Sequence, residues 1–206
     1  YERNANATVI PLELEPLESI FVVFAKEASS SSLVNDTDTN YPKPQTIATL
    51  AGPWTVSFNE SQRGPQDPVV FQSLYDWSTS KEDAIRYYSG TAIYRTEFTL
   101  KDIVPNNPLF INLSEVAVMA KVKVNEQYIG GVWTAPYRLN ISEAIKQGAN
   151  KVEIEVVNTW VNRLIGDSKL LVEERPTWTP NNPWNPSSPL QKSGLIGPVV
   201  IESITY

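Results

Sequence analysis

The 206-residue chain contains no cysteine and no histidine. The first absence excludes disulfides and thiol catalysis, and the second excludes Ser-His-Asp triads and histidine zinc sites within this chain. Positive charge is scarce, because 17 Lys and Arg face 23 Asp and Glu for a net charge of −6. This balance disfavours nucleic acid as a partner, and no apolar run approaches the roughly 18 residues that span a bilayer.

The residues that are present indicate a folded protein rich in strands and loops. Hydrophobic residues make up 41% of the chain, which argues against disorder. The length allows a sizeable core in one large domain or two unequal ones. Sixteen prolines, six Trp and nine Tyr are typical of a strand protein with aromatic-bearing loops. The sequence starts at Tyr1 without a signal-like segment, so we expect an excised piece of a longer protein.

The first 45 residues differ from the rest. Leu12 and Leu14 alternate with acidic residues, and residues 19–24 (SIFVVF) are apolar on both faces, as in a buried strand. Two strands alone are marginally stable, so we interpret residues 1–27 as strands from the end of a preceding β domain. Residues 28–45 lack any apolar period and are rich in Ser, Asn, Asp and Pro, which indicates a linker.

Residues 46–206 show apolar residues at every second position in five runs. Turn residues separate these runs, and the pattern predicts an all-β sandwich or jelly roll with a last strand over residues 198–205. We also expect short helices over residues 80–86 and 142–147, the second capped by Ser142 and ended by Gly148. The predicted inward sets are Trp54, Val56 and Phe58; Tyr94, Thr96, Phe98 and Leu100; Leu109, Ile111 and Leu113; Val116, Val118, Ala120, Val122 and Val124; and Val152, Ile154 and Val156.

An ordered set of motifs runs through residues 47–206. It comprises LAGPW at 50–54, Trp77, YSGTAIYR at 88–95, VKVN at 122–125, YRLNI at 137–141 and GANKV at 148–152. This set resembles the galactose-binding-like jelly roll, a sugar-binding-type β-sandwich found in multidomain glycoside hydrolases. Such domains are usually accessory. Relatives usually carry Asn-Gly after the central strand, whereas here Glu126 follows Asn125, a departure from the pair that favours a tight hairpin turn.

Two further segments narrow the resemblance. NTWVNRLIGD at 158–167 and ESIFVVF at 18–24 look like the C-terminal region of α-L-rhamnosidase-like enzymes of glycoside hydrolase family 106. The resemblance implies a bacterial source, a periplasmic or extracellular parent protein, and a catalytic barrel upstream of this chain. It also implies unused glycosylation sequons. No catalytic motif of the family matches any position here.

The residues themselves offer no carboxylate pair of the kind that glycosidases require. Most acidic side chains lie on the solvated faces of predicted strands. The segment 158–167 offers two readings. Asn162, Arg163 and Asp167 could clamp sugar hydroxyls through bidentate donors. Alternatively, Arg163 pairs with Asp167 or a neighbouring carboxylate, and Trp160 fills the end of the sandwich.

Two tryptophans on a Pro-rich stretch complete the candidate carbohydrate-binding set. Trp178 and Trp184 lie in TWTPNNPWNP at 177–186, which is too rich in proline for a central strand and is expected to be a surface loop. Flat aromatic faces suit sugar rings, but exposed apolar side chains more often mark a protein interface. Trp133 and Tyr137 are further aromatic candidates.

Cofactors and partners follow from the same reasoning. We expect no cofactor. A structural calcium is common in such sandwiches, but its ligands cannot be placed, and NDTDTN at 35–40 lacks the Gly and distal Glu of an EF-hand. The expected partner is the catalytic domain of the same polypeptide, with a rhamnose-containing oligosaccharide as a second possibility. The rival hypothesis is an autonomous carbohydrate-binding module for plant polysaccharide.

Overall fold

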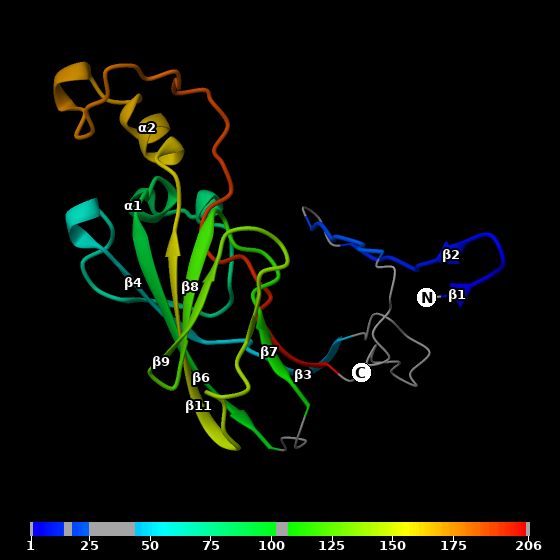
Figure 1. Cartoon of the computed structure of the whole chain (residues 1–206). Coiled ribbons are helices and arrows are strands. Elements are labelled where there is room, and N and C mark those ends of the chain that lie inside the picture. Colours follow the sequence, from blue (N-terminus) through cyan, green and yellow to red (C-terminus); the bar gives the residue numbers. More distant parts are fainter. Residues whose placement is uncertain (1, 15–17, 25–43, 102–106, 205–206) are drawn as a thin grey trace.

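The computed structural model describes residues 2–14, 18–24, 44–101 and 107–204. Two antiparallel sheets pack face to face and build a β-sandwich (Figure 1). The larger sheet has the strand order β5-β4-β6-β11-β8-β9, and the smaller has the order β10-β7-β12-β3. The predicted all-β, galactose-binding-like sandwich is therefore confirmed.

The strands follow the alternating runs of the sequence. Their bounds are β3 (Pro44–Thr49), β4 (Trp54–Phe58), β5 (Val69–Phe71), β6 (Thr91–Leu100), β7 (Leu109–Asn112), β8 (Met119–Val124), β9 (Gln127–Val132), β10 (Arg138–Asn140), β11 (Gly148–Val157) and β12 (Val200–Ile204). Short helical elements are η1 (Glu60–Gln62), η2 (Trp77–Thr79), α1 (Asp83–Arg86), α2 (Val161–Asp167) and η3 (Val172–Glu174).

The core lies between the two sheets and is dominated by aromatic rings. Trp54 and Tyr94 are fully buried, as their place on the inward phase predicts. The rings of Trp77 and Tyr94 stack with centroids 6.2 Å apart, and the Tyr94 hydroxyl accepts a hydrogen bond from the backbone N–H of Leu195 at 3.1 Å. Burial raises the pKa of Tyr94 well above its ordinary range. These rings supply much of the apolar area that stabilises the sandwich.

The tight hairpin between β8 and β9 forms without the usual glycine. Asn125 and Glu126 both have positive φ, of 49° and 67°, which is the backbone pattern of a type I′ turn. The side chain of Asn125 donates to the Ala144 carbonyl and to the Asn150 side chain, both at 2.8 Å, and accepts from the Lys151 N–H at 3.0 Å. These bonds fix the turn, so Glu126 occupies a left-handed position that favours glycine.

Two predictions within the sandwich are wrong in detail. Residues 142–147 form a turn, in which the Ala144 N–H donates to the Ile141 carbonyl, and Gly148 begins β11 where a helix end was expected. The inward face predicted from Val116 to Val124 is interrupted, because Val118 has φ 77° and a 44% exposed side chain. The alternation of apolar residues in the sequence therefore begins before β8 itself begins at Met119. The helix predicted over residues 80–86 is confirmed as α1.

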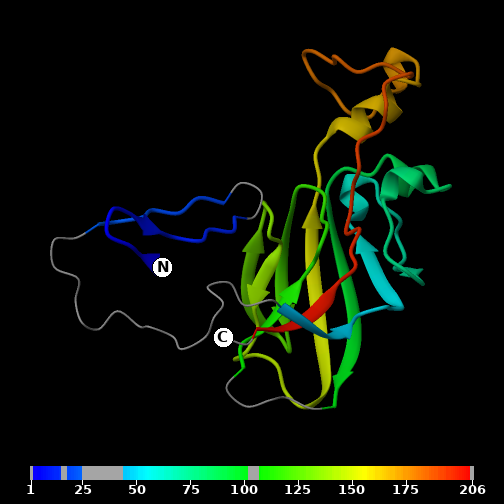
Figure 2. The ribbon, with the colours of Figure 1, turned by 90° about the vertical axis from the view of Figure 1, so that its right-hand side faces the viewer.

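The N-terminal residues do not form the predicted strands. Their two-stranded sheet joins β1 (Glu2–Arg3) to β2 (Thr8–Val9), and residues 10–14 and 18–24 are not in strands. Phe21 is 91% exposed and Val23 is 84% exposed, so the apolar run is not buried here. Figure 2 shows this segment beside the sandwich. Most of the predicted linker, with the calcium-like stretch 35–40, lies outside the described residues.

Candidate functional site at one end of the sandwich

A long connection between β11 and β12 projects beyond one end of the sandwich (Figures 1 and 2). We name residues 158–193 the α2 excursion, after the helix within it. Connections of this length are uncommon in compact domains, and ordered ones are usually functional.

Buried side-chain amides hold both ends of the α2 excursion. Asn158 accepts from the Gly90 N–H at 2.8 Å and donates to the Tyr88 carbonyl at 2.8 Å. Asn162 accepts from the Gln191 N–H at 2.8 Å and donates to the Gln191 carbonyl at 2.7 Å. Each amide therefore bonds to both a donor and an acceptor of a neighbouring backbone segment. Asn158 ties the start of the excursion to the sandwich, and Asn162 joins the two ends of the excursion to each other.

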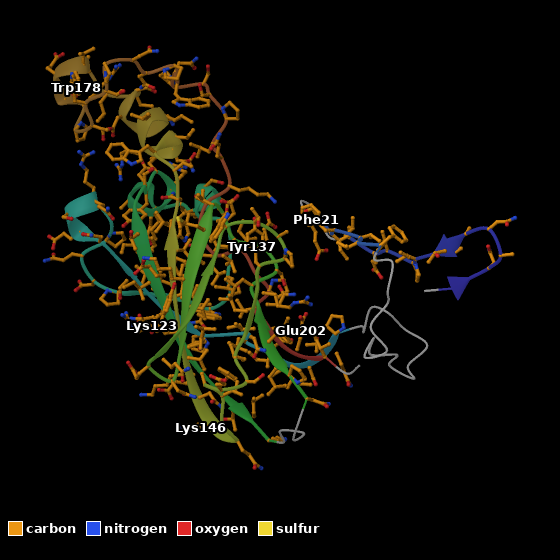
Figure 3. All side chains as sticks on the ribbon, in the orientation of Figure 1. Phe21, Lys123, Tyr137, Lys146, Trp178 and Glu202 are labelled. Atoms are coloured by element: carbon orange, nitrogen blue, oxygen red, sulfur yellow. The ribbon has the colours of Figure 1, made fainter. Side chains whose placement is uncertain are left out.

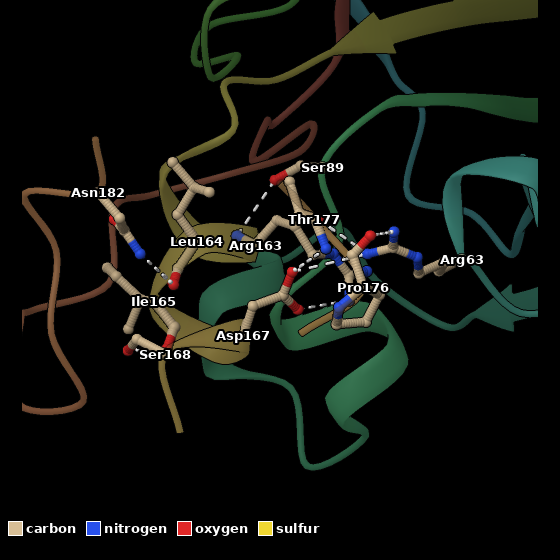
Figure 4. Close-up of polar contacts among 10 residues, drawn as sticks. All are labelled: Arg63, Ser89, Arg163, Leu164, Ile165, Asp167, Ser168, Pro176, Thr177 and Asn182. Carbon is tan, nitrogen blue, oxygen red and sulfur yellow. Dashed lines mark hydrogen bonds and ion pairs between the residues drawn. The ribbon is translucent and has the colours of Figure 1, made fainter. Parts of the chain in front are cut away.

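A buried carboxylate joins the α2 excursion to η1 (Figure 4). The Asp167 oxygens lie 3.6 Å from Arg63 Nη1 and 3.9 Å from Arg163 Nη1, and Oδ2 accepts from the Thr177 N–H at 3.1 Å. Arg63 also donates to the Pro176 carbonyl at 2.6 Å and to the Thr177 hydroxyl at 2.8 Å. Two guanidinium groups thus share one carboxylate, and the local charge is positive.

Arg163 has few partners for a buried cation. Its side chain is only 13% exposed, its guanidinium lies 3.9 Å from Asp167, and its Nη2 is enclosed without a hydrogen-bond partner among the described residues. Burial lowers the pKa of Arg163, and Asp167 acts in the opposite direction. A buried guanidinium nitrogen without a partner is costly, because its lost hydration is not replaced.

A small cavity opens beside this arginine. Its volume is about 140 Å³, and its lining includes Gln62, Arg63, Ser89, Trp160 and Arg163. The Trp160 side chain is 63% exposed at this cavity, so the expectation that it fills the end of the sandwich is wrong. No carboxylate is among the described residues that line the cavity.

The outer part of the α2 excursion presents apolar side chains to solvent. Trp178 is 83% exposed and Val172 is 73% exposed, with Leu171 at 61% beside them in sequence. Figure 3 shows Trp178 at the tip of the excursion, pointing away from the sandwich. Large exposed apolar side chains on one loop more often mark a protein interface than a solvent-facing surface.

The structure brings together only part of the predicted carbohydrate-binding set. Trp160 and Arg163 line the small cavity, whereas Trp178 and Trp184 are not among its lining residues. Asn162 and Asp167 are buried, and their polar atoms already serve protein partners. The predicted pairing of Arg163 with Asp167 is confirmed. Sugar binding by these six residues stays a prediction.

Sequence reasoning did not single out several residues of this site. Gln62 and Arg63 are neighbours in the chain, but Thr177 lies 114 residues after Arg63. The three residues meet only in the fold. Ser89 belongs to a motif that was used to recognise the fold. No local spacing distinguishes these residues from ordinary polar loop positions.

A second cavity lies on the outer face of the six-stranded sheet. This sheet-face cavity has a volume of about 500 Å³ and is lined by three cations, Arg95, Lys123 and Lys151, and by three carboxylates, Glu97, Glu126 and Glu153. Ion pairs join Glu153 to Arg95 at 2.8 Å and to Lys123 at 3.0 Å. These charges satisfy one another across the strands.

The described residues contain no cluster of three or more His, Cys, Asp or Glu that could hold a metal ion. Within the same ranges, no helix is long and apolar enough to cross a membrane.

The fold and this end site define a galactose-binding-like β-sandwich, and comparison with known proteins identifies its family. The family described as "Glycosyl hydrolase 2 galactose-binding domain-like" matches residues 74–183. The chain therefore belongs to this family.

Three relatives illustrate the match. A rhamnosidase structure from Novosphingobium sp. PP1Y is 35% identical, with a TM-score of 0.74, and the match covers 81% of this chain and 16% of that one. A protein of Formosa agariphila named "Putative beta-glucuronidase" is 39% identical over 183 residues, covering 77% of this chain and 16% of the relative. A β-glucuronidase structure from Ruminococcus gnavus, at 19% identity and a TM-score of 0.57, shares the fold. The chain thus spans about one sixth of the length of the rhamnosidase and of the Formosa protein.

Proposed function

We propose that this chain is a non-catalytic accessory domain of an α-L-rhamnosidase-like glycoside hydrolase. The observation that supports this most directly is the 35% identity to the Novosphingobium rhamnosidase, of which the chain matches only 16%. The absence of histidine and cysteine and of any matched catalytic motif agrees with an accessory role. Its role is to pack against the catalytic module and to shape a rim of the substrate cleft. The parent protein acts in the periplasm or outside the cell.

The α2 excursion is the surface that this proposal assigns to the catalytic module. Leu171, Val172 and Trp178 are all more than half exposed, and burying them against a neighbouring module removes apolar area from water. Asn158 holds the start of the excursion to the sandwich, and the Ser193 N–H at its end donates to Asp76, so the excursion is anchored at both ends.

Docking can be tested with the separately produced catalytic portion of the polypeptide. Val172→Asp should weaken its association with this chain at least about tenfold, since a charge then lies in an apolar contact. Val70→Asp is the matched control, because Val70 is 56% exposed on β5 and lies outside the excursion. Equal loss in both variants, or loss in neither, contradicts the assigned surface.

Catalytic silence is a second test of the same proposal. The chain alone should release no 4-nitrophenol from 4-nitrophenyl α-L-rhamnoside. Turnover that disappears on substitution of one carboxylate of this chain would show an active site here and overturn the accessory role.

The alternative is an autonomous carbohydrate-binding module, and the exposed faces of Trp160 and Trp178 favour it. A shallow aromatic site binds sugar weakly, with a Kd on the order of 0.1–1 mM. A rhamnose-containing oligosaccharide should then shift the Trp178 indole N–H resonance. Saturable binding together with unchanged docking of Val172→Asp would favour this alternative.

The division into residues 1–27, 28–45 and 46–206 belongs to the proposal as well. Among the described residues, β1 pairs with β2 and with no strand of the sandwich, so the sandwich should not need residues 1–27. Deleting residues 1–27 should leave a cooperative unfolding transition with an unchanged midpoint in urea. Loss of cooperativity would show that these residues complete the sandwich.

A further inference from the structure

We propose that the cavity beside Arg163 binds the anionic group of an acidic saccharide, with the guanidinium as its charge partner and Trp160 as the face for the sugar ring. This inference requires neither a docked catalytic module nor a particular activity of the parent protein. It rests on three features of the end cavity: its charge, its donors and its exposed indole.

The charge at the cavity is positive in an otherwise acidic chain. Its charged lining groups are Arg63 and Arg163, with no carboxylate among the described lining residues. The nearby Asp167 neutralises one of these two guanidiniums and lies behind the lining. One positive charge is therefore left over, while the chain as a whole carries −6. An anion in the cavity would be attracted in a partly buried setting, where screening by salt is weak.

The two arginines are not equivalent. Arg63 donates hydrogen bonds to the Pro176 carbonyl and the Thr177 hydroxyl, and its side chain is 41% exposed. Among the described residues, the Nη2 of Arg163 has no hydrogen-bond partner, and the ion pair of Arg163 with Asp167 is long at 3.9 Å. Since its Nη2 is enclosed, an anion would meet the part of Arg163 that lines the cavity and compensate the charge there. An oxyanion is the partner that a planar guanidinium prefers.

Two neutral side chains in the cavity lining can donate hydrogen bonds beside the arginines. The Gln62 side-chain carbonyl accepts from the Thr91 N–H at 2.9 Å, which leaves its NH₂ group as a donor. The Ser89 hydroxyl accepts from the Arg163 N–H at 3.3 Å and can still donate its own proton. These groups suit the oxygens of a carboxylate or sulfate and the adjacent sugar hydroxyls.

The exposed indole of Trp160 gives the site its preference for a sugar over a simple anion. The apolar C–H face of a sugar ring packs on an aromatic face while its hydroxyls reach polar groups. The cavity volume of about 140 Å³ is below the roughly 300 Å³ of small drug-sized sites, so it suits one end of a monosaccharide unit.

The test is a titration of the whole chain, followed through the indole N–H resonances of its tryptophans. The probes are glucuronate, glucose 6-sulfate, uncharged glucose and inorganic sulfate. Trp160→Phe assigns the reporting resonance. One or both charged sugars should shift the Trp160 signal saturably, and glucose should bind at least about tenfold more weakly. The pair of charged probes distinguishes a carboxylate site from a sulfate site.

Three variants separate the site from a general effect. Arg163→Gln should weaken binding of the charged sugar at least about tenfold and leave the weak binding of glucose unchanged. Trp160→Ala, at an exposed position where folding is not at risk, should abolish the preference for sugar over inorganic sulfate. Its binding is followed by calorimetry, because the reporting indole is removed. Trp178→Ala should change nothing, because Trp178 is exposed on the same excursion but does not line the cavity.

Several results would overturn the inference. Equal affinity for glucuronate, glucose 6-sulfate and glucose would show that charge plays no part. Inorganic sulfate binding as tightly as the sugars would show a simple anion site. If Arg163→Gln fails to fold, undiminished sugar binding by Trp160→Ala would still contradict the proposal.

Discussion

The two cavities of this domain differ in whether their charged side chains have partners of opposite charge. The sheet-face cavity is several times larger, at about 500 Å³ against about 140 Å³, but its three cations and three carboxylates balance one another. The end cavity is lined by two guanidiniums and no described carboxylate, and one of them is buried with an unpartnered nitrogen. Volume alone would select the sheet face, whereas unmet interactions favour the end cavity as the candidate ligand site.

Strand register explains why the charged side chains on the outer sheet face have partners of opposite charge. Lys123 lies directly opposite Glu153, and Lys121 lies opposite Glu155, in the pairing of β8 with β11. The corresponding ion pairs are 3.0 Å and 3.1 Å long. Alternation places these charges on the outer face, and antiparallel pairing brings opposite signs together. The end cavity has no such repeat, because its residues come from separate loops.

The largest expected contrast is between a tryptophan in the core and one on the excursion. Trp54→Ala should lower the free energy of unfolding by about 3–5 kcal/mol, because Trp54 is fully buried and its removal leaves a cavity. Trp178→Ala, at 83% exposure, should change it by less than about 0.5 kcal/mol. Urea unfolding of both variants measures the contrast. A loss below about 1 kcal/mol for Trp54→Ala would mean that the register of β4 is wrong.

The next contrast tests the carboxylate behind the end cavity. Asp167→Asn keeps the shape of the side chain but leaves the Arg163 guanidinium without its counter-ion, and should cost about 1–3 kcal/mol. This is below the range for a fully buried pair, because the separations are 3.6 Å and 3.9 Å and Arg63 is partly exposed.

Asp83→Asn is the control for that experiment. Asp83 forms an ion pair with Arg86 on α1, but its side chain is 70% exposed. Such a pair should contribute less than about 0.5 kcal/mol to unfolding in urea. Equal effects of the two substitutions would show that the Asp167 cluster is an ordinary surface pair and would weaken the contrast between the end site and the rest of the surface.

Prediction from the sequence was likewise more accurate for the strands of the sheets than for the loops that form the end cavity. Alternation identified the inward phase of β4, β6 and β11, because a one-residue slip would have exposed their whole apolar set. It failed at Val118, where the apolar period continues but the backbone leaves the strand with φ 77°. The continuous apolar run at residues 19–24 is not in a strand in this chain, and its place in a preceding β domain stays a prediction. Arg163 with Asp167 could be anticipated from their i, i+4 spacing. Arg63 could not, since its contact with Pro176 is made at a separation of 113 residues.

The β8–β9 turn shows a motif that departs from its family pattern while the structure is kept. Glu126 has φ 67°, which disfavours a residue with a Cβ. Glu126→Gly should therefore stabilise the domain by about 0.5–1 kcal/mol, despite the added flexibility of the unfolded chain. Asn125→Gly is the informative comparison, because it removes the bonds to Ala144, Asn150 and Lys151 and should destabilise. Destabilisation by both variants would contradict a strained turn.

The smallest expected effect lies on the sheet face and concerns pH. The hydrogen bond from Lys123, helped by Arg95, lowers the pKa of Glu153 below its ordinary value. A carboxyl group whose pKa is lowered by folding stabilises the fold above its unfolded pKa, and this contribution is lost as the pH falls through the folded value. The Glu153 side chain is 26% exposed, and its partners Arg95 and Lys123 are 47% and 50% exposed, so solvent screening should keep the contribution below about 0.5 kcal/mol.

Glu153→Gln removes this titration while keeping the length of the side chain. Its unfolding free energy should fall slightly below that of the unmodified chain near pH 7, and the two should converge as the pH falls through the lowered pKa of Glu153. Added salt should shrink the difference near pH 7, because exposed ion pairs are screened. A difference above about 1 kcal/mol, or one that grows as the pH falls, would mean that the sheet-face charges contribute more than their exposure allows. The larger cavity would then be a charged network in its own right, and the contrast with the end cavity would be lost.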